Sequence, residues 1–402
     1  MDDATTTLAT HRPAAGHDQL VTWAEEMVTP LAARAADAEA MRQLPQATVD
    51  DAADAGFFAA VLSERLGGGA LGLRSLTDAT RILAHGCVSS AWTLSFLAVH
   101  NWFVARGPAA LQDDVFGTGP YALMPCPLAP TGRAIRTDGG YELTGRWQWA
   151  TGVQHGNWVM VSAIVEQGSA PGPMFCLAPI ADVEVVDVWR TSGMRGTGSN
   201  DVIADRVFVP EHRTMTADEL RSDDPPGASL DPDRFVRYPL TPVLTLVASA
   251  PALGGAEAAV DAFRSRIQSR VLAYSLGDRQ IEQPAAQIRL AEALATVRAA
   301  RLVWSDAIER TCERYDSGGR FSTVERGAIR LAAAQTVKLA IDAVGIVLEG
   351  AGASVHFEDS PLQRIARDLA TLRGHVVFDW DRTAQLAGKL ELGIEPELTD
   401  ML

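Results

Sequence analysis

Trp158-Val159-Met160-Val161-Ser162-Ala163-Ile164-Val165 is a run of apolar and β-branched residues that predicts a buried β-strand. Similar runs lie at residues 141–144, 183–189 and 202–209, and glycines and prolines separate them. We place the β domain that these segments predict at residues 118–232. It decides the fold class because the sequence on either side of it has a different periodicity.

Helical periodicity flanks the predicted β domain on both sides. Residues 19–117 are Ala-rich, with Leu, Trp, Val and Phe recurring every three or four positions, which predicts an N-terminal α domain. Residues 233–402 contain longer helical segments that predict a four-helix bundle. Residues 1–18 are polar, lack the apolar stretch of a signal peptide, and are expected to form a loose tail. The predicted fold class is therefore α+β multidomain, with a central β-barrel or sandwich between an α-helical domain and a four-helix bundle.

Charge and cysteine content exclude several classes of function. The 402 residues include 35 basic and 50 acidic side chains, a net charge of −15, without a basic cluster, which argues against a nucleic-acid partner. The four cysteines form no C-x-x-C pair, so we expect neither a metal site nor a disulfide framework, and a cytoplasmic location. Residues 239–255 are uncharged, but three prolines interrupt them, and we expect no membrane span.

One glycine-rich stretch matches a nucleotide-binding pattern by text alone. Gly67–Gly72 satisfies G-x-G-x-x-G, but no clear strand precedes it and no acidic residue lies about 20 positions later. We interpret it as a turn, which leaves the chain without a recognisable nicotinamide-binding motif.

Aromatic and hydroxyl side chains concentrate in the segment Gly145–Gly152. Trp147, Trp149 and Thr151 could form a wall that holds a flat conjugated ring and hydrogen-bonds its edge. Ordinary core packing is the alternative interpretation of the tryptophans.

Two further segments carry candidate binding groups. Gly193–Ser199, with Thr197 and Ser199, exposes backbone N–H groups that suit an anion or a ring carbonyl, although a tight turn would look the same. His375 lies seven residues after Asp368, on the same helical face. A histidine near a cofactor can act as a base or hydrogen-bond donor, whereas an isolated one is commonly structural.

Taken together, these motifs resemble the acyl-CoA dehydrogenase superfamily from about residue 20 to about residue 390. Within it, the chain is similar to the two-component flavin-dependent monooxygenases. Their G-M-R-G-T-G-S pattern is intact at Gly193–Ser199, and their G-x-W-x-F-x-S-G pattern corresponds to Gly145–Gly152. The Pro-Leu-Gln-Arg-x-x-Arg-Asp run with a downstream histidine is matched at residues 361–368 and His375.

The sequence departs from the motifs of both branches of the superfamily, and the departures favour different branches. The dehydrogenases carry a glutamate base in a Tyr-Glu-Gly-Thr pattern, and here His375 and Val376 stand in place of its Tyr and Glu. Asp379 or Asp381 could replace that base only if the loop were shifted. Thr151, by contrast, is the residue that the dehydrogenases use, where the monooxygenases usually have Ser.

The resemblance implies the oxygenase component of a two-component monooxygenase that hydroxylates an aromatic or polycyclic metabolite, in secondary metabolism, through a flavin C4a-hydroperoxide. Reduced flavin (FMNH2 or FADH2) and molecular oxygen would be the cofactors, and a separate NAD(P)H:flavin reductase would be the partner. Three alternatives stay open. They are an N-oxygenase of an amino sugar or amine, an acyl-CoA dehydrogenase-type oxidoreductase, and a non-catalytic flavin-binding protein.

The resemblance also implies roles for individual residues and an assembly. Arg279 resembles an arginine that reaches the flavin phosphates of its own or a neighbouring subunit. The apolar faces of the bundle, such as residues 329–348, favour a homotetramer. The implied catalytic residues are His375 and Thr151, the cofactor-binding residues are Trp147, Trp149, Thr151, Thr197, Ser199, Arg279, Gly350 and Gly352, and the candidate substrate-binding residues are His100 and Trp102.

Overall fold

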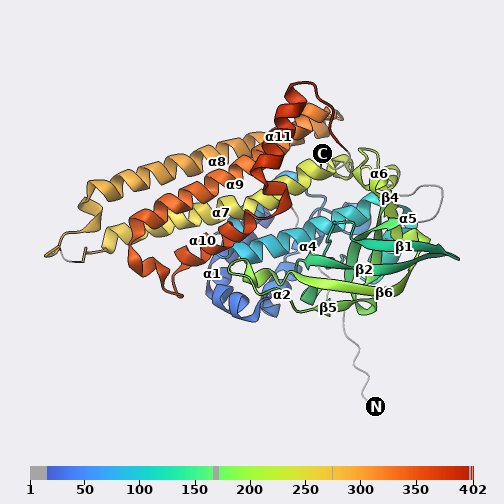
Figure 1. The fold of residues 1–402 in the computed structure, drawn as a ribbon, viewed down its shortest axis with the longest axis horizontal. Coiled ribbons are helices and arrows are strands. Elements are labelled where there is room, and N and C mark those ends of the chain that lie inside the picture. Colours follow the sequence, from blue (N-terminus) through green and yellow to red (C-terminus); the bar gives the residue numbers. More distant parts are fainter. Residues whose placement is uncertain (1–15, 166–171, 274, 398–399, 401) are drawn as a thin grey trace, which may run out of the picture.

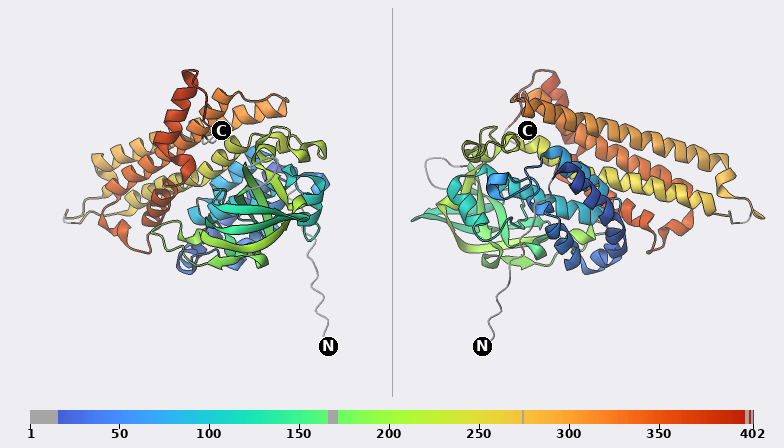
Figure 2. Two further views of the ribbon diagram at one scale, coloured as in Figure 1. Left: turned by 45° about the vertical axis from the view of Figure 1, so that its right-hand side comes forward. Right: turned by 180° about the vertical axis from the view of Figure 1, so that it is seen from behind.

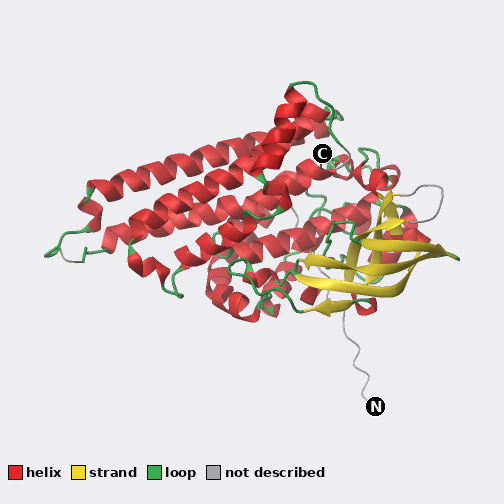
Figure 3. Cartoon of the chain, in the orientation of Figure 1, coloured by secondary structure: helices red, strands yellow, loops and turns green. Residues whose placement is uncertain are grey.

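The computed structural model describes residues 16–165, 172–273, 275–397, 400 and 402 (Figure 1). Helices precede and follow a central sheet, which confirms the predicted fold class in its three-part order (Figure 3). Residues 1–15 of the predicted tail lie outside the described residues. The first helix begins at His17, inside the segment that we expected to be tail.

The N-terminal part is built around one central helix. Among its helices, α4 (Val88–Arg106) is buried on all sides, and of its side chains only Phe96 is partly exposed, as expected for a helix surrounded by protein. The helices packed around it in this part of the chain are α1 (His17–Met41), α2 (Gln46–Asp54), α3 (Leu73–Leu83) and α5 (Ala109–Phe116).

The central part is a seven-stranded mixed sheet in the order β5-β6-β2-β1-β3-β4-β7. β1 and β3 pair in parallel and the other neighbours pair antiparallel. The strands are β1 (Gly132–Thr137), β2 (Gly140–Ala150), β3 (Trp158–Val165), β4 (Gly172–Pro179), β5 (Glu184–Val186), β6 (Asn200–Pro210) and β7 (Thr214–Thr216). The strand expected over residues 183–189 is shorter than predicted, because only three of its residues pair with β6.

The C-terminal part is a helical bundle that extends away from the sheet (Figure 2). Its long helices lie side by side, and the short helix α10 packs against both α7 and α9. The bundle helices are α7 (Leu240–Ser269), α8 (Pro284–Asp316), α9 (Thr323–Ala351), α10 (Pro361–Leu372) and α11 (Trp380–Glu391), and the single-turn helix α6 (Ala217–Arg221) precedes them.

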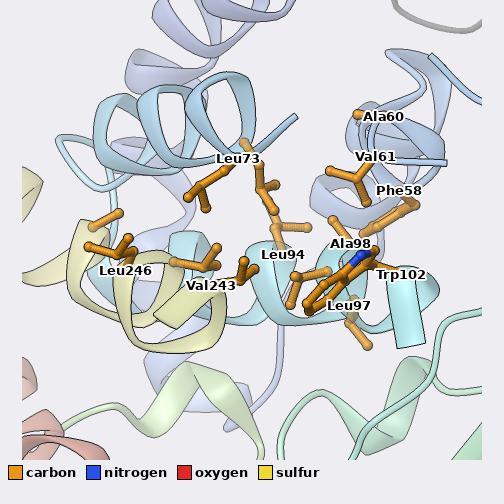
Figure 4. Packing of buried hydrophobic residues seen from close by; sticks show 14 of the residues in the cluster. Phe58, Ala60, Val61, Leu73, Leu94, Leu97, Ala98, Trp102, Val243 and Leu246 are labelled. Atoms are coloured by element: carbon orange, nitrogen blue, oxygen red, sulfur yellow. The ribbon is translucent and has the colours of Figure 1, made fainter. Parts of the chain in front are cut away.

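The largest core cluster joins the N-terminal helices to the bundle. Side chains of α3, α4 and α7 interdigitate there, with Leu94, Trp102 and Leu246 among them (Figure 4). In the part of the chain that the structure describes, two helices, α7 and α9, are long and apolar enough to cross a membrane. However, 89% of the apolar window of α7 is buried inside the protein, which marks it as a core helix. The corresponding window of α9 is 44% buried.

The glycine-rich stretch Gly67–Gly72 is a turn, as we interpreted it. A 3-10 turn, Glu64–Leu66, precedes it instead of a strand, and α3 begins directly after it. Gly68 allows the chain to pass close to the backbone, because a Cβ there would lie 2.2 Å from the carbonyl oxygen of Leu62.

Candidate active site

Three hydroxyl groups meet where β2 ends and β6 begins. Thr197 Oγ1 donates to the carbonyl of Met194 (2.9 Å) and lies 2.8 Å from Ser199 Oγ, which lies 2.9 Å from Thr151 Oγ1. Each hydroxyl has one proton, so Ser199 must donate to Thr197 and Thr151 to Ser199. The Thr151 oxygen is thereby left as a hydrogen-bond acceptor. Thr197 and Ser199 are buried and Thr151 is partly exposed, which makes Thr151 the accessible end of the chain.

The two candidate tryptophans of β2 have different surroundings. Trp147 is buried in the sheet core, and its indole N–H donates to the carbonyl of Ser162 (2.6 Å). Trp149 is 65% exposed and has a φ of 67°, at a register shift between β2 and β6. A bulky residue in the left-handed region is strained, and such residues concentrate at functional sites. Trp149 is therefore the tryptophan that is free to contact a bound ring.

The loop Gly193–Ser199 is anchored on α10 from the bundle. Asp368 of α10 accepts hydrogen bonds from the Met194 N–H (2.5 Å) and from the Ser89 hydroxyl (3.3 Å). The neighbouring Gly193 lies so close to α10 that a Cβ there would be 2.0 Å from the carbonyl oxygen of Arg367. The hydroxyl cluster of the β domain is thus held in place by the same helix that leads to His375.

Burial raises the pKa of Asp368 from its usual value of 3.8 to about 6. Between pH 4 and pH 6 the folded protein binds more protons than the unfolded chain, so protonation of Asp368 stabilises the folded state. This contribution to the free energy of unfolding is complete below about pH 4 and is lost as the pH rises through about 6. We expect Asp368→Asn to remove this part of the pH dependence while keeping an acceptor for the Met194 N–H. Urea unfolding of the wild type and of Asp368→Asn between pH 4 and pH 6 measures this pH dependence of the free energy of unfolding. The exposed Asp359→Asn is the control for removal of one carboxylate. Parallel curves for wild type and Asp368→Asn would contradict the prediction.

A series of aromatic rings connects His375 to α4. The His375 ring lies 5.3 Å from Trp92, which lies 4.5 Å from Phe96, which in turn lies 5.4 Å from His100, centroid to centroid. Trp92, Phe96 and His100 are four residues apart, so they share one face of the helix. The adjacent Thr93 meets the segment after β2, since a Cβ at Gly152 would lie 2.9 Å from its methyl group. Helix α4 therefore lies between the hydroxyl cluster and His375.

His375 is held as a neutral imidazole. Packing lowers its pKa from 6.5 to about 4, because neighbouring atoms displace the water that would solvate the charged ring. Its Nδ1 accepts a hydrogen bond from the Val377 N–H (3.4 Å), which favours the tautomer with the proton on Nε2. Asp379, which we considered as a substitute for a glutamate base, instead caps α11 by accepting from the Arg382 N–H (3.1 Å).

The two candidate substrate-binding residues of α4 are not brought together. His100 is buried, its pKa is lowered to about 4 by burial, and its Nδ1 lies 2.7 Å from the carbonyl of Met124. Because a carbonyl can only accept, the His100 proton is on Nδ1. Nε2 is then left as a hydrogen-bond acceptor at the end of the ring series. Trp102 lies elsewhere in the largest core cluster (Figure 4). Its ring stacks on Phe235 (5.1 Å between centroids), and its indole N–H donates to the carbonyl of Phe235 (2.9 Å).

The remaining cofactor-binding candidates form a separate group at the end of the bundle that is farthest from the sheet (Figure 1). Arg279 is exposed and donates to the carbonyl of Gln268 (2.9 Å), and the adjacent Gln280 donates to the carbonyl of Gly350 (2.7 Å). Gly352 has a φ of 76° and lies against the Arg270 guanidinium. Within one subunit, these residues do not contribute to the site around Thr151.

Sequence reasoning missed Trp92, Phe96 and the anchoring role of Asp368. The spacing of four between Trp92, Phe96 and His100 is a signal that could have placed the aromatic residues on one face. No comparable signal exists for Asp368, because its partners Ser89 and Met194 lie more than 170 residues away in the sequence.

Two segments that together make up more than half of the chain match known family domains. Residues 15–112 match the acyl-CoA dehydrogenase N-terminal domain, and residues 246–380 match the acyl-CoA dehydrogenase C-terminal domain. The chain belongs to the acyl-CoA dehydrogenase family. The resemblance inferred from the sequence motifs is thereby confirmed.

Full-length relatives identify the branch of the acyl-CoA dehydrogenase family. The chain is 33% identical to a pigment production hydroxylase of Rhodococcus sp., over 92% of this chain and 95% of that one. It is 30% identical to HsaA of Mycobacterium tuberculosis, the oxygenase subunit of a flavin-dependent monooxygenase, over 90% of this chain and 92% of HsaA. These matches group it with the flavin-dependent monooxygenases of the family, as the motifs predicted.

Solved structures agree with this grouping. The crystal structure of the HsaA monooxygenase superposes with a TM-score of 0.89 at 28% identity, covering 96% of this chain and 99% of HsaA. The structure of XiaF from Streptomyces sp. in complex with FADH2 and glycerol superposes with a TM-score of 0.90 at 28% identity, covering 96% of this chain and 98% of XiaF.

Proposed function

We propose that the chain is the oxygenase component of a two-component flavin-dependent monooxygenase that hydroxylates an aromatic substrate. The observation that carries this proposal is the ring series from His375 through Trp92 and Phe96 to His100, next to the hydroxyl cluster of β2 and β6. Aromatic walls with a few polar groups are typical of sites that hold flat rings. Relatives whose names state aromatic substrates, a resorcinol hydroxylase and a p-hydroxyphenylacetate 3-hydroxylase, support the same substrate class.

The residues around Thr151 fit a reduced flavin. Trp149 presents an exposed ring, and the Thr151 oxygen is an acceptor, as the N–H of a reduced isoalloxazine requires of its partner. Trp149, Thr151, Thr197 and Ser199 would hold the ring. When bound, a reduced flavin supplies the two electrons by which one atom of O2 enters an aromatic C–H bond and the other leaves as water.

His375 would act as a hydrogen-bond donor. Its pKa of about 4 keeps the ring neutral at physiological pH, and the proton on Nε2 can be donated to a substrate oxygen. The buried rings of Trp92 and Phe378 that surround it exclude water from this side of the site, which favours oxygen transfer over release of hydrogen peroxide.

The assembly that we propose includes more than one subunit. Arg279, Gly350 and Gly352 are remote from Thr151 within one chain, so they could contact a flavin only in another subunit's site. Together with the partly uncovered apolar face of α9, this supports a homotetramer. A separate NAD(P)H:flavin reductase would supply the reduced flavin, and we propose a cytoplasmic location without a nucleic-acid or membrane partner.

Turnover with a reductase tests the proposed function. The full-length protein, a flavin reductase, NADH and O2 are incubated with a panel of phenols that includes resorcinol and p-hydroxyphenylacetate, and hydroxylated product and hydrogen peroxide are both quantified. We expect product from at least one phenol. His375→Ala should lower the product formed per flavin oxidised by at least about 10-fold and raise hydrogen peroxide correspondingly, because a positioned proton donor is lost.

The exposed His356→Ala is the matched control and should leave this ratio unchanged. Flavin oxidation that yields only hydrogen peroxide with every phenol, and equally with His375→Ala, would overturn the oxygenase assignment. Bleaching of the oxidised flavin by an acyl-CoA would indicate dehydrogenation instead.

A further inference from the structure

A cavity separate from the proposed flavin site lies where the turn between α8 and α9 meets the segment before α7. Its volume is about 290 Å³, enough for a small molecule rather than a few waters. One side is formed by Arg234 and Arg237 of the 3-10 turn Arg234–Arg237, and the other by Tyr315, Gly318 and Arg320. The charged side chains among its lining residues are all arginines.

Two of these arginines lack a counter-ion. Arg320 is neutralised by Asp224 (2.6 Å) and Asp223 (3.6 Å). By contrast, no carboxylate of the described residues lies within 4.0 Å of the guanidinium of Arg234 or of Arg237. Arg237 Nη2 donates to the carbonyl of Ala228 (2.8 Å), while its Nη1 is buried without a hydrogen-bond partner among the described residues. A buried donor left unpaired is unfavourable, so a partner that the described residues do not provide would stabilise this Nη1.

Several carboxylates close in sequence to the lining residues or paired with Arg320 have other partners. Asp316 accepts from the Tyr238 hydroxyl (2.6 Å), and Asp233 accepts from the Phe235 N–H (2.9 Å). Asp223 is shared by Arg320 and Arg326. The net charge of the cavity lining is therefore positive despite the acidic composition of the protein.

The local backbone places Arg234 and Arg237 on one side of the same turn. Residues three apart in a 3-10 turn are eclipsed, so Arg234 and Arg237 project from the same side. Arg234 extends over Gly318, where a Cβ would lie 2.9 Å from its Nη1, and Gly318 has a φ of 82°. Two adjacent guanidinium forks match the geometry of a bidentate oxyanion.

We propose that this cavity is a binding site for a small oxyanion, a phosphate ester or a carboxylate, held by Arg234 and Arg237. The ligand is distinct from the flavin, because the residues proposed to contact flavin phosphates, around Arg279, lie at the opposite end of α8. Ring contacts from Tyr315 through Tyr238 and Phe235 to Trp102 link the cavity to α4, the helix that carries the candidate active site on another face.

Calorimetric titration of the full-length protein with inorganic phosphate, and separately with malonate, at constant ionic strength in chloride buffer tests the proposal. We expect one of the two to bind with a Kd of about 1 mM or lower, and saturating FAD to leave that Kd unchanged. Binding of phosphate alone would identify a phosphate ester as the ligand class, and binding of malonate alone a carboxylate. Each of Arg234→Gln and Arg237→Gln should weaken binding at least about 10-fold.

The matched controls are Arg298→Gln, an exposed arginine on α8, and Arg279→Gln, and both should bind as the wild type does. Arg234 is exposed, so Arg234→Gln tests the site without disturbing the core if Arg237→Gln unfolds. Competition by FAD, an unchanged Kd in Arg234→Gln, or failure of both anions to bind below about 10 mM would overturn the proposal.

Discussion

Gly193→Ala is expected to lower the free energy of unfolding by about 3 kcal/mol and to weaken binding of reduced flavin by at least about 10-fold. The new Cβ would lie 2.0 Å from the carbonyl oxygen of Arg367 and 2.7 Å from the Asp368 amide nitrogen, so α10 and the loop would have to separate. That separation would stretch the hydrogen bond between Asp368 and the Met194 N–H and displace Thr197 and Ser199 with it. Urea unfolding and equilibrium flavin binding under anaerobic conditions measure the two effects.

Gly388→Ala is the matched control for Gly193→Ala. Gly388 lies inside α11, and a Cβ there would meet no atom within 4 Å. Alanine should therefore stabilise the protein by about 0.5–1 kcal/mol through its higher helix propensity and leave flavin binding unchanged. If Gly193→Ala had the same free energy of unfolding and the same affinity for reduced flavin as the wild type, the contact between the loop and α10 would not position the hydroxyl cluster.

Arg106→Met is expected to lower the free energy of unfolding by about 4 kcal/mol. Arg106 is buried at the end of α4, and its guanidinium donates to the carbonyls of Leu220 (2.9 Å), Ser222 (2.5 Å), Val236 (2.7 Å) and Tyr238 (2.8 Å). Burial lowers its pKa to about 9, so the group is still charged at neutral pH. Methionine fills much of the volume but leaves several buried carbonyls without donors, and each costs about 1–3 kcal/mol.

Thermal and urea unfolding of Arg106→Met measure this loss, with Arg298→Met as the control. Arg298 is exposed on α8, and its replacement should change stability by no more than about 0.5 kcal/mol. A loss below about 1 kcal/mol in Arg106→Met would show that water can satisfy the four carbonyls.

The order of the three parts was predictable because each has its own local periodicity. Residues 158–165 form β3 with the bounds read from the sequence, since all of its side chains except Ile164 are buried. The short strand Glu184–Val186 was overestimated because its flanking residues are apolar without pairing. Periodicity therefore identified elements well and their ends less well.

The candidate site was predictable only in part, and the reason is physical. Thr151, Thr197 and Ser199 lie in two motifs that strand pairing between β2 and β6 brings together. Trp102 looked like a pocket residue, but the direction of a side chain on a helix that is buried on all sides cannot be read from the sequence. The role proposed for Arg237 could not be predicted, because the lack of a partner for its Nη1 among the described residues depends on residues from other parts of the chain.

The nearly complete burial of α4 restricts how the substrate range of this enzyme can change. A substitution at Trp92 or His100 would alter the aromatic series and the core packing at once, so a gain in substrate range there would be accompanied by a loss of stability. Phe96 is the residue of α4 that is partly exposed. Natural variation and laboratory selection for new aromatic substrates should therefore accumulate at Phe96 first.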